Sequence, residues 1–242
     1  MFVFVVSMDN KISFKSNIKF VDKRTFQNLL KSRDFKYIDY GWSETISNRW
    51  FNKIDLLYTE KVRTCTAGAI VSPHKKAKGF HIYHSRDNHR FLDAFFHYMF
   101  ESLSKPQRAL LIGAKNLSDT PFSLANFRKA KELIGTKTKN ISFFEGHSFR
   151  TSETDFCYSL KDDTWTIYSS FLSKGKEIPV ITPQRLKRAF QKIQIASGDR
   201  LFVGGKEITR KKCPEIFASF PIGKEKKESM TFYGRILQKL GI

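Results

Sequence analysis

The strongest limit on the fold comes from residues 66–84, which have the pattern of a β-hairpin. Small and apolar residues come first, a turn is expected over 72–79, and an apolar strand returns over 80–84. Two strands joined by a short turn pair antiparallel, so their open ends lie side by side. The sequence therefore predicts that residue 65 lies close to residues 81–84.

Further helices and strands follow the hairpin in alternation. Apolar residues recur at helical spacing over 88–104 and 124–134, and Pro106 and Gly135 mark the ends of these helices. The aromatic segment 37–46 is expected to be a loop. Additional strands are expected over 108–113, 141–144, 155–160 and 165–168. This order predicts an α+β fold, a β-sandwich core flanked by helices.

Positive charge is concentrated towards the C-terminus. The chain has 43 Lys and Arg against 23 Asp and Glu, a net charge of +20, and residues 172–242 carry 16 of the basic and 6 of the acidic residues. Basic helices are expected over 183–196 and 231–240. We therefore expect a main domain, residues 1–171, followed by a small basic C-terminal extension. Such a field attracts anions, so contact with an acidic protein, nucleic acid or anionic membrane is expected through 182–212.

The three cysteines, Cys65, Cys157 and Cys213, are too few and too irregularly spaced for a disulfide framework. No Cys-x-x-Cys pair occurs, so no zinc site is expected. Cys157 lies in an apolar segment and is predicted to belong to the core. Residues 1–6 are apolar but lack the basic start and cleavage site of a signal peptide, which predicts a buried strand. A reducing compartment such as the cytoplasm is expected, and it would keep a catalytic thiol free.

Cys65 is the candidate nucleophile. A thiolate is the reactive form of cysteine, and a histidine brought close by the hairpin can deprotonate it. His81 and His84 are both on the returning strand, three residues apart. Because side chains alternate along a strand, only one of them can face Cys65.

The same residues also have a plainer interpretation. Cys65 can be a small buried core residue, the histidines can be incidental, and Thr59 can simply stabilise a turn with its hydroxyl. Glu145-Gly146-His147 is expected to be an ordinary turn.

One segment resembles a known family of enzymes. Thr59 lies six residues before Cys65, small residues flank the cysteine, and Gly79-Phe80-His81 follows. This arrangement is similar to the active-site segment of the bacterial chemoreceptor glutamine deamidases. Two features depart from that family: Val62-Arg63-Thr64 precedes the cysteine where the family has Leu-Gly-Ser, and His81 is one residue closer.

The order of elements over about 55–170 is also similar to that family. A helix follows the histidine, then a strand over 109–114, a helix that contains Asn126, a strand, and a Gly-x-x-x-Arg element from Gly146 to Arg150. The cytotoxic necrotizing factor toxins share this Cys–His chemistry and act on glutamine in small GTPases.

The resemblance implies a protein-glutamine deamidase whose catalytic domain spans 1–171. Cys65 would be the nucleophile, His81 the base with His84 as substitute, and Thr59 would orient the site. No cofactor or metal is implied, and the substrate would be a glutamine-containing protein. The toxins imply secretion without a classical signal peptide into a host cytosol. Two alternatives stay open: a nucleic-acid-binding protein, and another Cys–His enzyme such as a protease or transglutaminase.

Overall fold

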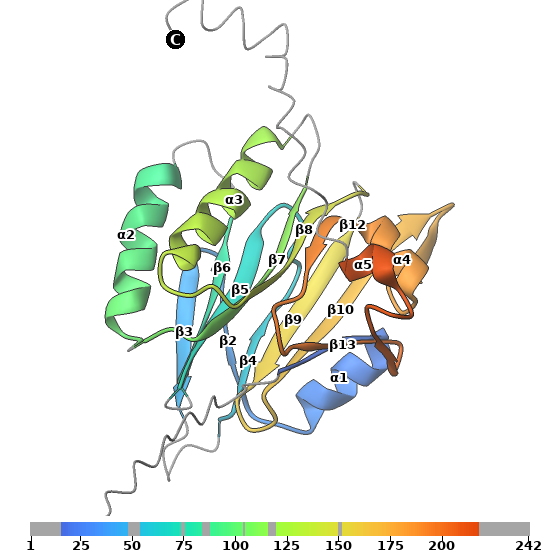
Figure 1. Ribbon diagram of the computed structural model, residues 1–242, viewed down its shortest axis with the longest axis horizontal. Coiled ribbons are helices and arrows are strands. Elements are labelled where there is room, and N and C mark those ends of the chain that lie inside the picture. Colours follow the sequence, from blue (N-terminus) through green and yellow to red (C-terminus); the bar gives the residue numbers. More distant parts are fainter. Residues whose placement is uncertain are drawn as a thin grey trace, which may run out of the picture.

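The structure is a computed structural model of the 242-residue chain that describes residues 16–47, 54–73, 76–83, 88–103, 105–115, 120–149 and 152–217. It shows two packed β-sheets with helices on their outer faces (Figure 1). The predicted α+β class, a β-sandwich core flanked by helices, is confirmed. The strand expected over 1–6, the helix expected over 231–240 and His84 lie outside the described residues.

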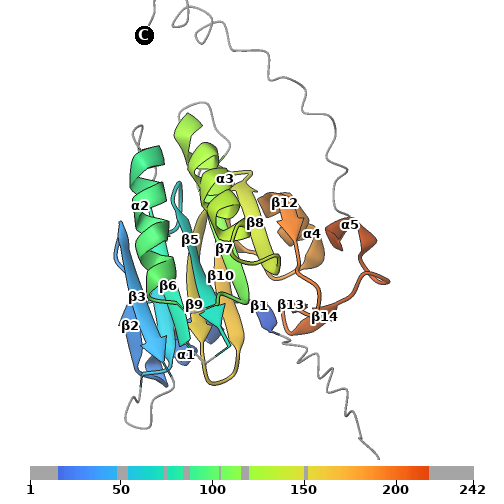
Figure 2. The same cartoon turned by 60° about the vertical axis from the view of Figure 1, so that its left-hand side comes forward.

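One sheet has six strands in the order β12-β8-β7-β5-β6-β3. Its strands are β3 (Trp42–Ser47), β5 (Thr66–Ser72), β6 (Lys76–Ile82), β7 (Arg108–Lys115), β8 (Ile141–His147) and β12 (Phe190–Gln194). Helices α2 (Asn88–Glu101) and α3 (Pro121–Gly135) lie over its outer face (Figure 2). Both helices agree with the predicted spacing, because Phe96 and Phe127 bury their rings against this sheet.

The second sheet has eight strands, in the order β14-β13-β1-β10-β9-β4-β2 with β11 paired to β10. Its strands are β1 (Asn17–Val21), β2 (Phe35–Tyr37), β4 (Leu56–Thr59), β9 (Glu153–Ser159), β10 (Thr164–Ser173), β11 (Lys176–Pro179), β13 (Arg200–Val203) and β14 (Lys206–Ile208). Helix α1 (Lys23–Lys31) begins at Asp22, whose side chain caps it, and buries Phe26 against Cys157. Cys157 is therefore a core residue as predicted, and burial raises the pKa of its thiol to about 12.

Aromatic side chains fill much of the space between the two sheets. Phe20 and Phe144 meet across it with ring centroids 4.9 Å apart, and Phe156 stacks on Trp165 at 5.9 Å. Burying such large apolar side chains is the main source of the stability of the sandwich.

The predicted hairpin is confirmed, with a shorter turn than expected. β5 and β6 pair antiparallel from Thr66 opposite Ile82 to Ser72 opposite Lys76. The loop expected over 37–46 is wrong, because β3 occupies the second half of that segment and pairs with β6 at the edge of the sheet.

The basic segment from 172 to 217 is part of both sheets. The expected boundary at 171/172 falls within β10, β13 pairs with β1, and β12 pairs with β8. The helix expected over 183–196 ends early, as α4 (Pro183–Ala189), and a short α5 (Pro214–Phe217) follows later. The chain turns into β12 because Phe190 packs against Phe144 in the core between the sheets.

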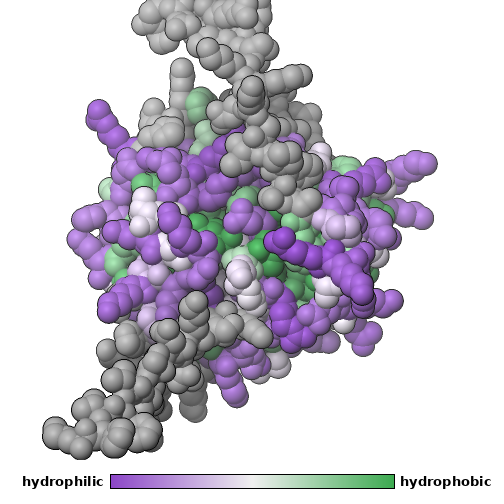
Figure 3. Space-filling view, viewed as in Figure 1, coloured by the Kyte–Doolittle hydropathy of each residue, from purple (hydrophilic) through white to green (hydrophobic). Residues whose placement is uncertain are grey.

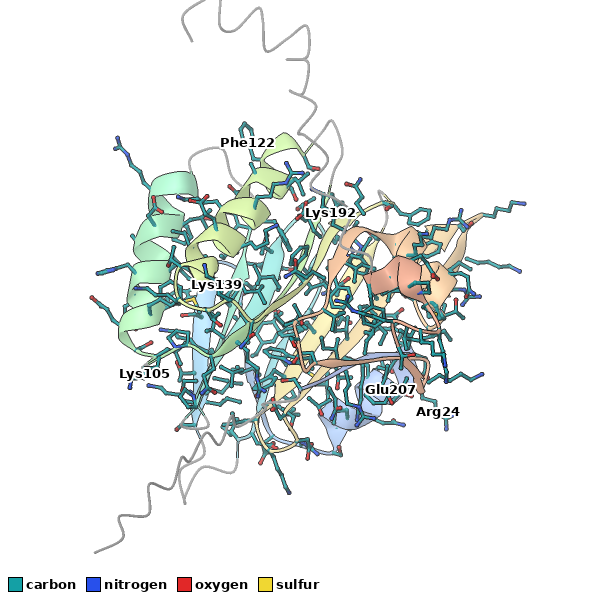
Figure 4. The ribbon with its side chains drawn as sticks, in the orientation of Figure 1. Arg24, Lys105, Phe122, Lys139, Lys192 and Glu207 are labelled. Carbon is teal, nitrogen blue, oxygen red and sulfur yellow. The ribbon has the colours of Figure 1, made fainter. Side chains whose placement is uncertain are left out.

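Polar and charged side chains cover most of the face shown in Figure 3, and hydrophobic residues show between them near its centre. Among the cations of this surface, Arg24 on α1 and Lys192 on β12 are exposed (Figure 4). Within the described residues, no helix combines the length and the apolar composition needed to cross a bilayer.

Candidate active site

Cys65 ends the loop that leads from β4 into β5, at the edge of the space between the sheets. Its side chain is 7% exposed and belongs to the core between the sheets. Its carbonyl oxygen accepts a hydrogen bond of 2.8 Å from the backbone N–H of Ala114, at the end of β7. The backbone of the candidate nucleophile is therefore fixed by the sheet although the residue itself lies outside a strand.

The loop before Cys65 is held from two sides. The backbone N–H of Val62 donates to the carbonyl oxygen of Thr154 on β9 at 2.8 Å. The hydroxyl of Ser123, in the first turn of α3, donates to the carbonyl oxygen of Thr64 at 2.5 Å. These bonds tie the loop to the second sheet and to a helix, which limits the positions that the Cys65 sulfur can take.

A glycine makes room for the backbone of Cys65. Gly113 has φ +123°, and a Cβ atom there would lie 2.3 Å from the carbonyl oxygen of Cys65. The next residue, Ala114, is also held at positive φ, +64°. Such strained backbone in a strand is typical of a functional site, where it brings the chain close to another element.

His81 lies on the same face of the sheet as Cys65. Ala67 on β5 pairs with His81 on β6, and Cys65 is two residues before Ala67, so the two side chains are diagonal neighbours. Diagonal neighbours on one face are roughly 7–8 Å apart at the backbone, which a ring and a sulfur can bridge. Consistent with this, Phe80 and Ile82 pack on the opposite face, under the helices.

Thr59 fixes the orientation and the tautomer of His81. The Thr59 hydroxyl oxygen lies 2.8 Å from the carbonyl oxygen of Ile38 and 2.6 Å from Nδ1 of His81. The carbonyl can only accept, so the single hydroxyl proton points to Ile38 and Nδ1–H must donate to Thr59. The other nitrogen, Nε2, then carries the lone pair. Nε2 is buried and has no hydrogen-bond partner among the described residues.

The electrostatics favour a neutral His81 ring at neutral pH. Burial lowers its pKa from 6.5 to about 4, and the nearby Asp39 carboxylate partly offsets this by raising it. A neutral ring with Nε2 unprotonated is the form that can accept a proton from a thiol.

Tyr40 is a neighbour of both groups that the sequence did not single out. Its ring centroid lies 4.5 Å from that of His81. Burial raises the pKa of its phenol, and the negative charge of the Cys65 thiolate raises it further. Tyr40 is nevertheless 42% exposed, so it lies where the site meets solvent.

The structure contains a second, similar pair of residues. His147 is fully buried, and its Nε2 lies 2.8 Å from the Thr154 hydroxyl, which in turn lies 3.0 Å from that of Ser169. Burial lowers the pKa of His147 to about 3, and the neighbouring Lys115 lowers it as well. The turn expected at Glu145-Gly146-His147 is wrong, because these residues end β8.

The structure thus joins two of the four predicted site residues, Thr59 and His81, by a hydrogen bond, and the strand register puts Cys65 on the same face of the sheet as His81, although its sulfur makes no hydrogen bond to Nε2 of that ring. It does not describe His84. Within the described part of the chain, no group of three His, Cys, Asp or Glu residues is arranged to hold a metal ion.

Comparison with known proteins identified no relative: no family model matches the sequence, and no curated protein matches it. A function for the chain therefore has to be inferred from the site itself.

Proposed function

We propose that the chain is a protein-glutamine deamidase that uses Cys65 as nucleophile, His81 as general base and Thr59 as the residue that orients the base. The observation that carries the proposal is the Thr59–His81 hydrogen bond of 2.6 Å, which leaves Nε2 of His81 as an acceptor on the face where Cys65 lies. His147 also has a threonine partner and one buried ring nitrogen without a partner, so the hydrogen bond supports a catalytic role only because His81 shares a face of the sheet with Cys65 and lies against the exposed ring of Tyr40.

The proposed reaction has two steps. Nε2 of His81 takes the thiol proton while the Cys65 sulfur attacks the side-chain amide carbon of a glutamine. The proton passes to the amide nitrogen, which leaves as ammonia, and a thioester remains. A water molecule, deprotonated by His81, then attacks the thioester; glutamate leaves and the proton returns to the sulfur. Backbone N–H groups between Thr64 and Thr66 are the proposed donors to the negatively charged oxygen, a role worth about 3–4 kcal/mol per donor.

The test is ammonia release and peptide mass spectrometry of glutamine-containing proteins incubated with the wild type and with Cys65→Ser. We expect conversion of glutamine to glutamate by the wild type and none by Cys65→Ser or His81→Asn. Cys213→Ser is the matched control, because this cysteine is more accessible than the buried Cys65 and lies next to α5, which contributes no residue to the candidate site. Cleaved or cross-linked products in place of deamidation would instead support a protease or a transglutaminase. Equal conversion by Cys65→Ser would refute the proposal.

The basic side chains on α4 and in the turn before α5 supply a second contact in this proposal. Lys187, Arg188, Arg210, Lys211 and Lys212 are exposed, which suits an acidic protein, nucleic acid or an anionic membrane. Binding to DNA, RNA or anionic vesicles that weakens steeply with salt and survives Cys65→Ser would support such a contact. Release into a host cytosol remains part of the proposal and depends on the resemblance to the toxins.

A further inference from the structure

Exposed aromatic side chains are gathered beside the candidate thiol site. Nine large hydrophobic side chains are exposed among the described residues, and three of them form what we call the aromatic rim: Tyr40 (42%), Trp42 (67%) and Tyr83 (48%). Trp42 is the most exposed of all nine. Most of the others lie on α2, α3 and β10, away from this edge. Exposed aromatic groups that cluster in this way mark a binding surface rather than ordinary surface composition.

The residues of the rim lie on or next to β3 and β6, and β6 carries His81. Trp42 pairs with His81 across β3 and β6, and the backbone N–H of Gly41 donates to the carbonyl oxygen of His81 at 2.7 Å. Tyr83 follows Ile82, the partner of Thr66, and so lies beside Cys65. A molecule bound to these rings would therefore lie next to the strand that carries His81.

Gly41 brings the two sides of the rim together. It has φ +78°, and a Cβ atom there would lie 3.1 Å from the ring of Tyr83. Tyr37 is exposed as well but is not part of the rim, because its ring lies 5.6 Å from that of Tyr58, on the face of the second sheet that α1 covers.

Among the described residues around the rim, basic side chains are paired with acidic ones. Lys36 pairs with Glu44 at 3.4 Å, and Lys61 pairs with Glu60 at 3.2 Å, whereas the chain carries a net charge of +20. A rim without excess positive charge does not select an anionic polymer. Its complement is an apolar, uncharged surface, for which Trp and Tyr are the usual anchors.

We propose that the aromatic rim binds the protein substrate, and that it selects a glutamine flanked by apolar side chains. This proposal rests on the proposed function and specifies its substrate class. Trp42 and Tyr83 contact the flanking residues, while the glutamine side chain passes between them towards Cys65.

The activity test uses two synthetic peptides of equal length and charge, in which one glutamine is flanked either by leucine and valine or by glycine and serine. We expect a higher kcat/KM for the apolar peptide, and we expect Trp42→Ala and Tyr83→Ala to lower the ratio of the two kcat/KM values about tenfold, mainly through KM. Tyr98→Ala is the matched control, because Tyr98 is 62% exposed but lies on α2. Equal rates for the two peptides, or an unchanged ratio in the rim variants, would overturn the rim proposal alone. Ammonia release that persists in Cys65→Ser would overturn the proposed function instead.

A binding test decides the proposal even where turnover of short peptides is slow. The chain has three tryptophans, of which Trp42 is exposed and Trp165 is buried, so acrylamide quenching of tryptophan fluorescence reports on the rim once the third is removed by Trp50→Phe in every protein compared. In the Cys65→Ser protein, the apolar peptide should protect the fluorescence from quenching and the glycine-serine peptide should not. Protection that persists in Trp42→Phe, or no protection at all, contradicts binding at the rim.

Discussion

Replacing Thr59 by valine keeps the shape of the side chain and removes the one hydroxyl that holds the imidazole of His81. That hydroxyl serves two buried groups, Nδ1–H of His81 at 2.6 Å and the carbonyl oxygen of Ile38 at 2.8 Å. A buried polar group left without its partner costs about 1–3 kcal/mol, so two such groups should lower the free energy of unfolding by about 2–6 kcal/mol. Urea unfolding measures this loss, which a typical domain of this size tolerates.

The same substitution should slow the chemistry of Cys65. Without an acceptor, Nδ1–H no longer fixes the tautomer that leaves Nε2 free, and a loss of about 1–3 kcal/mol in the positioning of the base corresponds to roughly 5- to 150-fold in rate. The assay is the rate of alkylation of Cys65 by iodoacetamide at pH 7, followed by peptide mass spectrometry, together with ammonia release. Thr59→Ser keeps the hydroxyl and should restore most of both rates.

The second His–Thr pair supplies the control for this prediction. Thr154→Val removes a hydroxyl that lies 2.8 Å from Nε2 of His147, so it should destabilise the fold by a similar amount. It should leave the alkylation of Cys65 at the wild-type rate. If Thr59→Val is destabilised yet its Cys65 reacts as fast as in the wild type, Thr59 has only a structural role and the proposed orientation of His81 is wrong.

Three further predictions concern the backbone and the pH dependence of the site. Gly113→Ala should abolish the alkylation of Cys65 and destabilise the fold, because its Cβ would meet the Cys65 carbonyl oxygen at 2.3 Å. The control is Gly175→Ala, at φ +73° in open space, which should cost only about 1 kcal/mol of backbone strain. An equal loss in the free energy of unfolding in both variants would contradict the close approach of Gly113 to Cys65. Burial raises the pKa of Asp155 to about 6, so the ionised carboxylate destabilises the fold above that pH. Asp155→Asn should therefore raise the free energy of unfolding by about 1–2 kcal/mol at pH 7, a gain that shrinks below pH 6 and vanishes near pH 4 in urea titrations. The acid limb of the ammonia-release profile should have its midpoint near the His81 pKa of about 4; a midpoint at the ordinary value of 6.5 would show that the ring is not buried as described.

The sequence predicted the hairpin next to the candidate site, because a hairpin depends on short-range pattern. The alternation and turn residues of 66–84 indicated the hairpin, and antiparallel pairing places the residue before one strand beside the end of the other. For this reason the sequence alone predicts that Cys65 lies close to His81. Thr59 was found through the spacing of a family motif, because a single hydroxyl six residues upstream of a cysteine has no pattern of its own.

The residues that the sequence missed depend on contacts between distant segments. Nothing local in Glu145-Gly146-His147 reveals that β12, more than forty residues later, pairs with it and turns a presumed loop into a strand. The aromatic rim was missed for a similar reason. Residues 37–46 resemble a loop because Trp42 and Tyr40 are exposed at an edge, and only the pairing of β3 with β6 shows that they surround the site.

The two His–Thr pairs differ in the charge that each ring meets, and this difference explains why only one of them suits a thiol enzyme. A general base becomes an imidazolium when it accepts the thiol proton, so a nearby anion lowers the cost of the step and a nearby cation raises it. Asp39 raises the pKa of His81, whereas Lys115 lowers that of His147 beyond the effect of burial. His147 also packs against Phe190 in the core, with ring centroids 4.6 Å apart, whereas His81, which is itself only 1% exposed, packs against Tyr40, whose side chain is 42% exposed. The His147–Thr154 pair therefore stabilises the core. The His81–Thr59 pair lies beside a strand end, with an anionic neighbour and an exposed rim, and there the histidine can act as a base.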